Sequence, residues 1–352
     1  MAFMRITSPH AHRPGNSGDV MRLVLLALLP GFAVQSWFFG WGVLINVLLA
    51  ASFSLTLEAA VIKLRNRPVS FYLKDCSALV TAALLALAIP PSSPWWLILT
   101  GCLFAIIIGK HLYGGLGFNP FNPAMVAYVV LLISFPVQMT NWTLPQNALA
   151  EGLQLPSFVD ALKASFGIAP LIDGVTGATP LDIVKQNSSL LLEQLTVKEP
   201  ALNGQWAGAG WEWVGIAYLC GGAFLLFRKV FTWHAPVGML AALTVMSFLF
   251  WDPQSAANNG SPLFHLLSGA TMLGAFFIVT DPVTSASSTK GRLIYGALIG
   301  ITIYIIRIWG NYPDAVAFAV LLMNFAAPFI DFYTVPRTYG HVQSRRATEK
   351  QP

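Results

Sequence analysis

The chain has 352 residues, of which 55% are hydrophobic and only 10% are charged, and its formal charge is +5. A soluble domain carries roughly a quarter charged residues, so this composition excludes an ordinary water-soluble enzyme. Long apolar runs indicate an integral membrane protein, in which helices satisfy the backbone amides of an open chain. The basic excess calls for no nucleic-acid partner, because the membrane orientation described below accounts for it.

Ten apolar segments of near-spanning length follow one another along the chain. They lie near 20–39, 41–62, 76–91, 94–109 and 122–138, and near 211–227, 234–251, 266–281, 292–308 and 313–332. The sequence therefore predicts an all-α integral membrane protein with ten transmembrane helices, five in residues 20–138 and five in 211–332. The other parts are an N-terminal tail (1–19), a long connection (139–210) and a C-terminal tail (333–352). The first helix follows a basic tail without a cleavage pattern, so we expect it to be retained.

Basic residues gather on one side of the predicted membrane. With a cytoplasmic N-terminus, four of the 20 Lys and Arg residues fall outside, namely Lys163, Lys185, Lys198 and Arg307. The sixteen inner ones are Arg5, Arg13, Arg22, Lys63, Arg65, Arg67, Lys74, Lys110, Arg228, Lys229, Lys290, Arg292, Arg337, Arg345, Arg346 and Lys350. This asymmetry in short loops favours cytoplasmic termini and an even helix count. The connection 139–210 then lies on the outer side.

A repeat links the two groups of helices. Residues 123–135, PAMVAYVVLLISF, align with 313–325, PDAVAFAVLLMNF, and seven of the thirteen positions are identical. Apolar helices also produce chance matches, but the shared Pro and the unbroken register favour duplication. Because each unit has five helices, the two copies are predicted to be inverted relative to each other. Such repeats commonly hold a site near the membrane midplane, between broken helices.

Residues 109–126, GKHLYGGLGFNPFNPAMV, interrupt the apolar pattern. Their glycines and two Asn-Pro steps disfavour a regular helix, because Pro removes a donor and clashes with the preceding turn. Two interpretations stay open. The first is an ordinary cytoplasmic loop that enters the fifth helix at Pro123. The second is a re-entrant segment whose Asn119 and Asn122 amides bind a polar ligand or cap a half-helix.

Cysteines and histidines limit the cofactors. Cys76, Cys102 and Cys220 lie in predicted helices without paired spacing. The chain alone therefore cannot build an iron–sulfur cluster, although a cluster shared between subunits stays open. The six histidines fall in tails or at helix ends, which disfavours a bis-histidine haem,. We predict neither a metal site nor a catalytic residue in this chain.

The stretch LIDGVTGATPLD, residues 171–182, is small, polar and prone to turns. Asp173 and the glycine after it predict a tight turn, and Thr176 and Thr179 offer hydroxyls with little steric cover. Pro180 restricts Thr179 to an extended conformation. By these properties alone, a Ser/Thr turn in a surface loop is the preferred interpretation.

The same residues carry a resemblance to known proteins. DGVTGAT, residues 173–179, matches the pattern Asp-x-x-Ser/Thr-Gly-Ala-Ser/Thr, which resembles the site where the bacterial flavin transferase moves FMN from FAD to the last Ser or Thr. With the helix count, the loop after the fifth helix and GFNPFNPA, the chain resembles, over about residues 15–340, the D subunits of Rnf (Rsx) ion-translocating electron-transport complexes. These are related to the B subunits of the sodium-pumping NADH:quinone reductase. The shorter chain and terminal tails favour the Rnf group.

The resemblance implies a function. Rnf complexes couple electron flow between reduced ferredoxin and NAD to transport of sodium ions or protons across the bacterial inner membrane. Thr179 would carry covalent FMN, linked through its phosphate, as an electron relay. The recognition residues around it would be Asp173, Thr176, Gly177 and Ala178.

Partners and a second cofactor follow from the same resemblance. The implied partners are the other Rnf subunits, including a second subunit with covalent FMN, the flavin transferase that attaches the cofactor, and membrane lipid. The family fold resembles urea channels, and its members hold a noncovalent riboflavin in the membrane domain. We expect Asn119 and Asn122 to contact that riboflavin.

Ion coupling should involve ionisable groups inside the membrane, because a charge there is costly and is usually placed for a reason. The candidates are Glu58, Asp75, Asp281 and Asp314. Three of them lie near predicted helix ends, where a solvated or capping carboxylate is the alternative interpretation. Asp281 is the first choice, because Pro282 breaks the eighth helix directly after it.

Two other functions stay open. A solute channel or transporter would use the same inverted repeat and broken helices without a redox cofactor. A scaffold subunit that only assembles other electron carriers would have no use for the TGAT motif.

Overall fold

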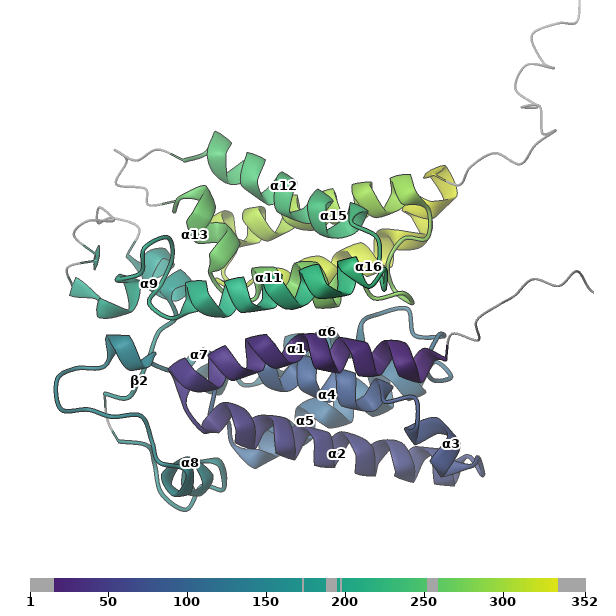
Figure 1. The fold of residues 1–352 in the computed structure, drawn as a ribbon, viewed down its shortest axis with the longest axis horizontal. Helices are drawn as coiled ribbons and strands as arrows, with labels where there is room; N and C mark the ends of the chain where they lie inside the picture. Colours follow the sequence, from purple (N-terminus) through teal and green to yellow (C-terminus); the bar gives the residue numbers. More distant parts are fainter. Residues whose placement is uncertain (1–15, 173, 188–194, 197, 252–258, 335–352) are drawn as a thin grey trace, which may run out of the picture.

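The computed structural model describes residues 16–172, 174–187, 195–196, 198–251 and 259–334. These residues are mostly helical, and their one ladder joins β1 (Trp142–Thr143) to β2 (Thr176–Gly177) in antiparallel register. Figure 1 shows two helical bodies side by side, one formed by the first half of the chain and one by the second. The long connection between them lies at one end of the molecule.

Four helices are long and apolar enough to cross a membrane. They are α1 (Ser17–Phe39), α2 (Gly42–Leu64), α15 (Thr289–Trp309) and α16 (Val316–Thr334). Asn16 caps the start of α1, because its side chain accepts a hydrogen bond from the Gly18 amide, and Gly40, with a φ of 83°, caps its end,. The four helices correspond to the first, second, ninth and tenth predicted segments, so the chain is an all-α membrane protein by helix length and composition.

The other predicted segments form shorter helices. Four are continuous: α4 (Ser77–Ala88), α6 (Pro123–Ser134), α11 (Trp211–Phe227) and α12 (His234–Leu249). α5 (Trp95–Leu103) continues as the π-helix η1 (Phe104–His111). The eighth segment is divided into α13 (Pro262–Leu267), α14 (Thr271–Leu273) and the π-helix η4 (Gly274–Ile278). Short π-helical turns are frequent at functional sites.

Four details differ from the sequence-based prediction. The fifth segment ends as α6 at Ser134, and α7 (Pro136–Thr140) follows, because Pro136 cannot continue the hydrogen-bond ladder,. The eighth segment breaks at 268–270, where Gly269 has a φ of 61°. Cys76 precedes α4 in a left-handed conformation instead of lying inside the helix. A short helix that we did not predict, α3 (Val69–Leu73), lies between α2 and α4.

The two bodies meet along a seam that we define by two helix pairs, α1 with α11 and α6 with α16. Glycines allow the first pair to approach closely. A Cβ at Gly31 would come within 2.1 Å of the Tyr218 ring, and one at Gly221 would lie 2.1 Å from the Ala27 carbonyl oxygen. The Tyr218 hydroxyl donates a hydrogen bond of 2.8 Å to Gln35 across this pair. Small residues and one polar contact therefore fix the distance between α1 and α11.

The molecule has two chemically different ends. The start of α1 and the end of α16 lie together at what we call the tail end, and α8 (Phe158–Ser165), β2 and α9 (Pro180–Gln186) lie at the opposite, loop end (Figure 1). The loop end also holds the 3-10 turns η2 (Gln146–Ala148) and η3 (Pro200–Leu202). Described basic residues outside the connection gather at the tail end, with Arg307 as an exception. Arg5, Arg13, Arg337, Arg345, Arg346 and Lys350 lie outside the described residues.

The separation of the ends predicts the outcome of a topology experiment. A reporter inserted after Gln186 and a reporter fused to the C-terminus should lie on opposite sides of the membrane, because α9 and the end of α16 lie at opposite ends of the molecule. Paired alkaline phosphatase and fluorescent-protein fusions measure this. Finding both positions on the same side of the membrane would contradict the arrangement.

Candidate functional site

Thr179 is the first residue of the candidate site at the loop end. It precedes α9 in an extended conformation, with φ −71° and ψ 159°, as Pro180 at the first helical position requires,. Its hydroxyl donates a hydrogen bond of 2.6 Å to Asp182, and the Asp182 amide donates back to that hydroxyl at 3.3 Å. The two residues thus form a capping box, which we did not predict,. The signal in the sequence was the spacing Thr-x-x-Asp with Pro directly after Thr.

The residues before Thr179 form a fixed turn and strand. Gly174 has a φ of 86°, in agreement with the predicted turn, whereas Asp173 lies outside the described residues. Thr176 pairs with Thr143 in the ladder, and a Cβ at Gly177 would come within 2.9 Å of the Leu144 side chain. The structure therefore holds Thr176 in a strand while Thr179 stands at a helix start. Ala178, between them, is half-buried.

A cavity of about 310 Å³ opens beside Thr179, and we call it the outer cavity. It is lined by residues of α1, α4, α6, α9, α11 and the break before α14, so it lies between the two bodies. Aromatic rings form part of its wall, with Trp142 and Trp211 4.9 Å apart between centroids. Ligand pockets in proteins measure about 300–1,000 Å³ and are mostly apolar with a few polar groups, which matches this cavity.

Two carboxylates, those of Asp182 and Asp314, also line the outer cavity. Burial raises the pKa of the Asp182 carboxyl, and Asp314 raises it further, while the hydrogen bonds from Thr179 lower it,. Lys185 does not neutralise the pair directly, because its ammonium donates to the Ile306 and Arg307 carbonyl oxygens at the end of α15. The cavity is therefore lined by aromatic rings and by two carboxylates, of which Asp314 lies 3.9 Å from Arg307.

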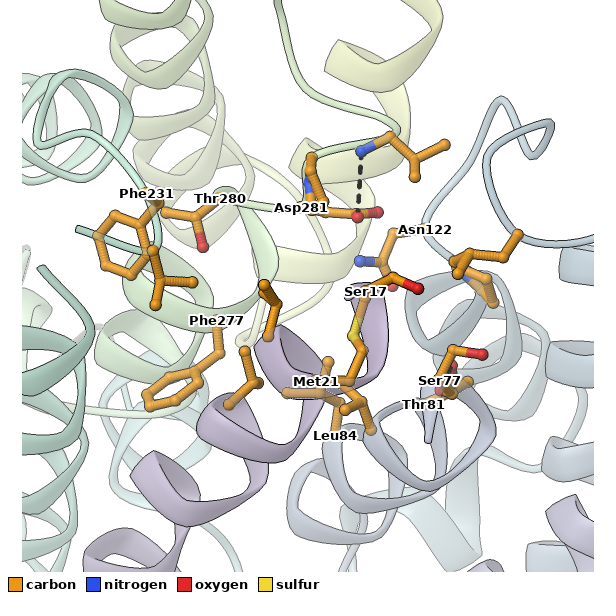
Figure 2. Close-up of a pocket in the computed structure, with 18 of the residues that line it drawn as sticks. Ser17, Met21, Ser77, Thr81, Leu84, Asn122, Phe231, Phe277, Thr280 and Asp281 are labelled. Carbon is orange, nitrogen blue, oxygen red and sulfur yellow. Dashed lines mark hydrogen bonds between the residues drawn. The ribbon is translucent and has the colours of Figure 1, made fainter. Parts of the chain in front are cut away.

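A second cavity, of about 350 Å³, lies between the bodies toward the tail end, and we call it the inner cavity. It brings together Asn119, Asn122 and Asp281, three residues that we selected from distant segments of the sequence. Figure 2 shows Asp281 and Asn122 on facing elements of this cavity, with Phe277, Met21 and Leu84 forming its apolar wall. The arrangement offers a few polar groups on an apolar surface, as ligand pockets do.

The two asparagines have different roles. The Asn122 side chain accepts hydrogen bonds from the Ala124 and Met125 amides, so it caps α6,. Residues 112–122 form turns, which favours the loop interpretation of this segment over a re-entrant helix. Asn119 donates to the Phe121 carbonyl oxygen, and its own side-chain oxygen is buried without a partner. That unpaired acceptor would suit a ligand donor.

The four predicted ion-path carboxylates do not lie together. Asp75 accepts from the Ser77 amide and hydroxyl at 2.8 and 2.6 Å, so it caps the start of α4. Asp314 lines the outer cavity at the start of α16, 3.9 Å from Arg307. Asp281 lines the inner cavity and accepts from Val283 and Thr284. Asp281 therefore has hydrogen-bond donors, but no basic residue bonds to it directly among the described residues.

Glu58 belongs to a buried cluster that we did not predict. Its carboxylate lies 2.5 Å from the Lys110 ammonium and 3.5 Å from His111 Nε2, and all three side chains are buried inside the first body. Lys110 also donates to the Ser77 hydroxyl at 2.7 Å. The sequence signal was a lysine at the end of the apolar run FAIIIGK,. We had assigned this lysine to membrane orientation alone.

Arg307 is the second buried cation that we had assigned only to orientation. Its guanidinium donates to the His265 carbonyl oxygen at 2.7 Å, to the Ser268 carbonyl oxygen at 3.4 Å and to the Thr271 hydroxyl at 2.8 Å. These groups surround the break between α13 and α14. Arg307 therefore satisfies carbonyl oxygens that the broken helix leaves without amide partners.

Side chains that could bind a metal ion do not cluster in the described part of the chain. No group of three or more His, Cys, Asp or Glu side chains could hold a metal ion there. Cys76, Cys102 and Cys220 are free thiols.

Comparison with known proteins identifies the class and then the family. Proteins that match nearly the whole chain are named as subunits of ion-translocating oxidoreductase complexes. The D subunits of such complexes from Cellvibrio japonicus and Ectopseudomonas mendocina are 60% and 58% identical over 100% and 97% of this chain and 99% and 97% of their own lengths. The Vibrio vulnificus protein of the same name is 52% identical over 97% of this chain and 100% of its own. The profile of the NQR2, RnfD, RnfE family matches residues 4–340, and the chain belongs to this family. The predicted resemblance is confirmed.

We expect removal of the Lys110 charge to destabilise the folded protein strongly. Lys110→Met should lower the free energy of unfolding by about 3–5 kcal/mol, because Glu58 would be left as an uncompensated buried charge,. Adding Glu58→Gln should restore much of the loss, since the pair is then replaced by neutral groups. Denaturant unfolding of the purified protein in detergent measures both variants.

As a control, Lys63→Met at the exposed end of α2 should change stability by less than about 0.5 kcal/mol,. Equal losses in Lys63→Met and Lys110→Met would rule out this role.

Proposed function

We propose that this chain is the D subunit of an Rnf-type complex. In this proposal it couples electron transfer between ferredoxin and NAD to translocation of sodium ions or protons. The proposal is supported by relatives that are 52–60% identical over nearly their whole length and are named as the D subunits of ion-translocating oxidoreductase complexes. Its partners would be the other subunits of the complex, including a second subunit with covalent FMN.

The observation that carries the proposal is the position of Thr179. The last threonine of DGVTGAT lines an aromatic cavity at the loop end, whereas Thr176 is held in a strand. A flavin linked through its phosphate to Thr179 could place its ring against the tryptophans of that cavity. The carboxylates of Asp182 and Asp314 would repel the phosphate,. We therefore expect the phosphate to lie toward the cavity mouth, on the side of Thr179 that faces away from them.

The residues around Thr179 would position and tune the cofactor. FMN supplies the electron-transfer chemistry when bound, and the protein sets its position and potential. β2 fixes the approach to Thr179, and α9 fixes its backbone. When a flavin transferase moves FMN from FAD to Thr179, the Thr179 oxygen would bond to the FMN phosphorus, AMP would leave, and the hydroxyl would give up the proton that it donates to Asp182 in this structure.

We further propose that ten helices span the membrane as two inverted five-helix repeats, with the architecture of urea channels. Equivalent packing supports this proposal, because α2 lies against α4 and α5 while α12 lies against α13, η4 and α15. In each repeat, the fourth helix also ends with a buried cation that bonds to a residue of the third helical segment. Lys110 bonds to Ser77, and Arg307 bonds to the carbonyl oxygen of Ser268. The tail end would face the cytoplasm of a bacterial inner membrane and the loop end the periplasm, as the basic residues favour.

Ion movement is assigned to Asp281 first, with Glu58, Asp75 and Asp314 as the other candidates. Asp281 is the one that lines the inner cavity together with Asn119 and Asn122. The same cavity is our proposed riboflavin site, because the Asn119 side-chain oxygen is buried and unpaired there. A solute channel would use the same cavities, and a scaffold subunit would leave Thr179 unmodified. Covalent flavin therefore separates the redox function from the other two.

Covalent flavin should be found on Thr179 alone. Thr179→Ala should abolish the fluorescence of the denatured polypeptide in a gel, because it removes the oxygen that would carry the phosphate. Thr176→Ser should retain it, because serine keeps the recognition hydroxyl. Ultraviolet in-gel fluorescence of protein produced with the flavin transferase measures the label.

The loop end offers a matched control for this experiment. Ser157 starts α8 with a hydroxyl that donates to Asp160 at 2.6 Å, the same local geometry as Thr179 with Asp182. Ser157→Ala should therefore leave the label unchanged, since the segment lacks the recognition pattern. Label that persists in Thr179→Ala would refute the assignment, and an unlabelled wild-type protein would favour the channel or scaffold.

Asp281→Asn should impair ion transport more than electron entry. The change keeps the shape of the side chain and removes a carboxylate that lines the inner cavity. Ion uptake per electron transferred, measured in sealed vesicles with confirmed complex assembly, should fall toward background while the Thr179 label stays. Asp19→Asn, an exposed carboxylate at the tail end, is the control and should behave as wild type. Unchanged uptake in Asp281→Asn would remove this residue from the ion path.

A further inference from the structure

A third cavity, of about 380 Å³, lies at the tail end on the first body, next to the inner cavity, with which it shares Ser17, Lys110 and Leu116. The end of α2, the α3 helix and the turns after η1 surround it. Its wall contains the cationic side chains of Arg65, Arg67 and Lys74, all exposed. We call this site the basic pocket.

The charges of the basic pocket do not cancel. Lys110 and Glu58 line its floor, but they neutralise each other at 2.5 Å. Asp75 is the remaining acidic group on its wall, and its carboxylate is already engaged by Ser77. Three cations therefore face one occupied carboxylate, and the pocket carries a surplus of about two positive charges. Such a surplus attracts anions.

Hydrogen-bond donors of the pocket are also placed for an anion. Arg67 donates to the Tyr72 hydroxyl and lies 5.8 Å from the Tyr72 ring, which orients its guanidinium,. His111 is 5% exposed, and its Nδ1 has no hydrogen-bond partner. A buried ring nitrogen without a partner is costly unless a ligand or water completes it. Guanidinium groups bind phosphate oxygens with particular strength.

Apolar side chains around the mouth distinguish a lipid from a free anion. Phe71 in α3 and Phe118 in the turns after η1 line the pocket and are 71% and 73% exposed. Leu64 and Leu112, which are 82% and 67% exposed, lie nearby in the chain, at the end of α2 and directly after η1. Aromatic and basic residues at the end of a spanning helix are typical of the membrane–water boundary. A ligand with both a phosphate and acyl chains would meet the cations and these side chains together.

We propose that the basic pocket binds the phosphate headgroup of an anionic glycerophospholipid from the leaflet at the tail end. Basic pockets next to membrane-spanning helices bind such headgroups. The lipid would fill the space between α2, α3 and the turns after η1, above the Glu58–Lys110 pair. Glycerol 3-phosphate offers a phosphate group without acyl chains, and with more negative charge than the lipid diester, so it serves to separate the two sources.

Native mass spectrometry of the full-length protein in detergent tests the proposal. Phosphatidylglycerol, phosphatidylcholine and glycerol 3-phosphate are titrated separately, and dissociation constants are compared. Arg67→Gln with Lys74→Gln should weaken phosphatidylglycerol binding by about 25-fold, about fivefold for each cation removed. This double variant keeps Arg65, whose guanidinium bonds to the His111 carbonyl oxygen and supports the fold.

A second double variant controls for general surface charge. Arg228→Gln with Lys229→Gln removes two exposed cations at the tail end that do not line the pocket, and it should leave phosphatidylglycerol binding unchanged. Tighter binding of phosphatidylglycerol than of phosphatidylcholine and glycerol 3-phosphate, lost only in the first variant, is the expected result. Equal binding of both lipids would overturn the proposal and leave a charged partner surface as the use of these cations. Glycerol 3-phosphate binding as tight as the lipid would also overturn it.

Discussion

Breaks inside an apolar body leave backbone carbonyl oxygens without amide partners, and this constraint explains how the buried cation Arg307 is placed. In lipid each unsatisfied backbone group is costly, so a broken helix persists only where protein covers it. Arg307 provides that cover by donating to the carbonyl oxygens of His265 and Ser268 at the break before α14. Lys110, the buried cation of the first body, bonds instead to side chains, the Ser77 hydroxyl at the start of α4 and the Glu58 carboxylate. Arg307 thus makes the interrupted helix possible next to the outer cavity, whereas Lys110 compensates a buried carboxylate.

The seam imposes a second constraint, because the two bodies can enclose cavities only if they approach closely in between. Gly31 and Gly221 bring α1 and α11 together, and the bond from Tyr218 to Gln35 holds them there. The inner and outer cavities then open on either side of this contact, one with Asp281 and one with Asp314. The acidic groups are therefore separated along the seam and belong to different ends of the molecule. Their chemistry differs as well, since tryptophan rings and Thr179 line the outer cavity and not the inner one.

Sequence patterns predicted well what depends on local composition. The four longest helices, the turn at Gly174, the extended Thr179 and the gathering of basic residues at the tail end all follow from short-range rules. The patterns could not show that Glu58 and Lys110 meet, because 52 residues separate them and both lie in apolar runs. Nor could they show that Asn119 and Asp281 share a cavity, since that requires the two bodies to be placed against each other. The break at 268–270 was missed because only Gly269 marks it in an apolar stretch.

The bond between Thr179 and Asp182 links the proposed modification to charge in the outer cavity. A phosphate ester at Thr179 has no hydroxyl hydrogen, so Asp182 would lose its shortest hydrogen bond and keep only the Thr179 amide, at 3.3 Å. Burial and Asp314 already raise the pKa of the Asp182 carboxyl, and a nearby phosphate would raise it further,. Because a raised pKa favours the protonated form, the folded protein is stabilised by this proton at low pH, and that contribution is lost as pH rises through the shifted pKa. An attached flavin would therefore make Asp182 more prone to hold a proton or a cation, directly beside the proposed electron carrier.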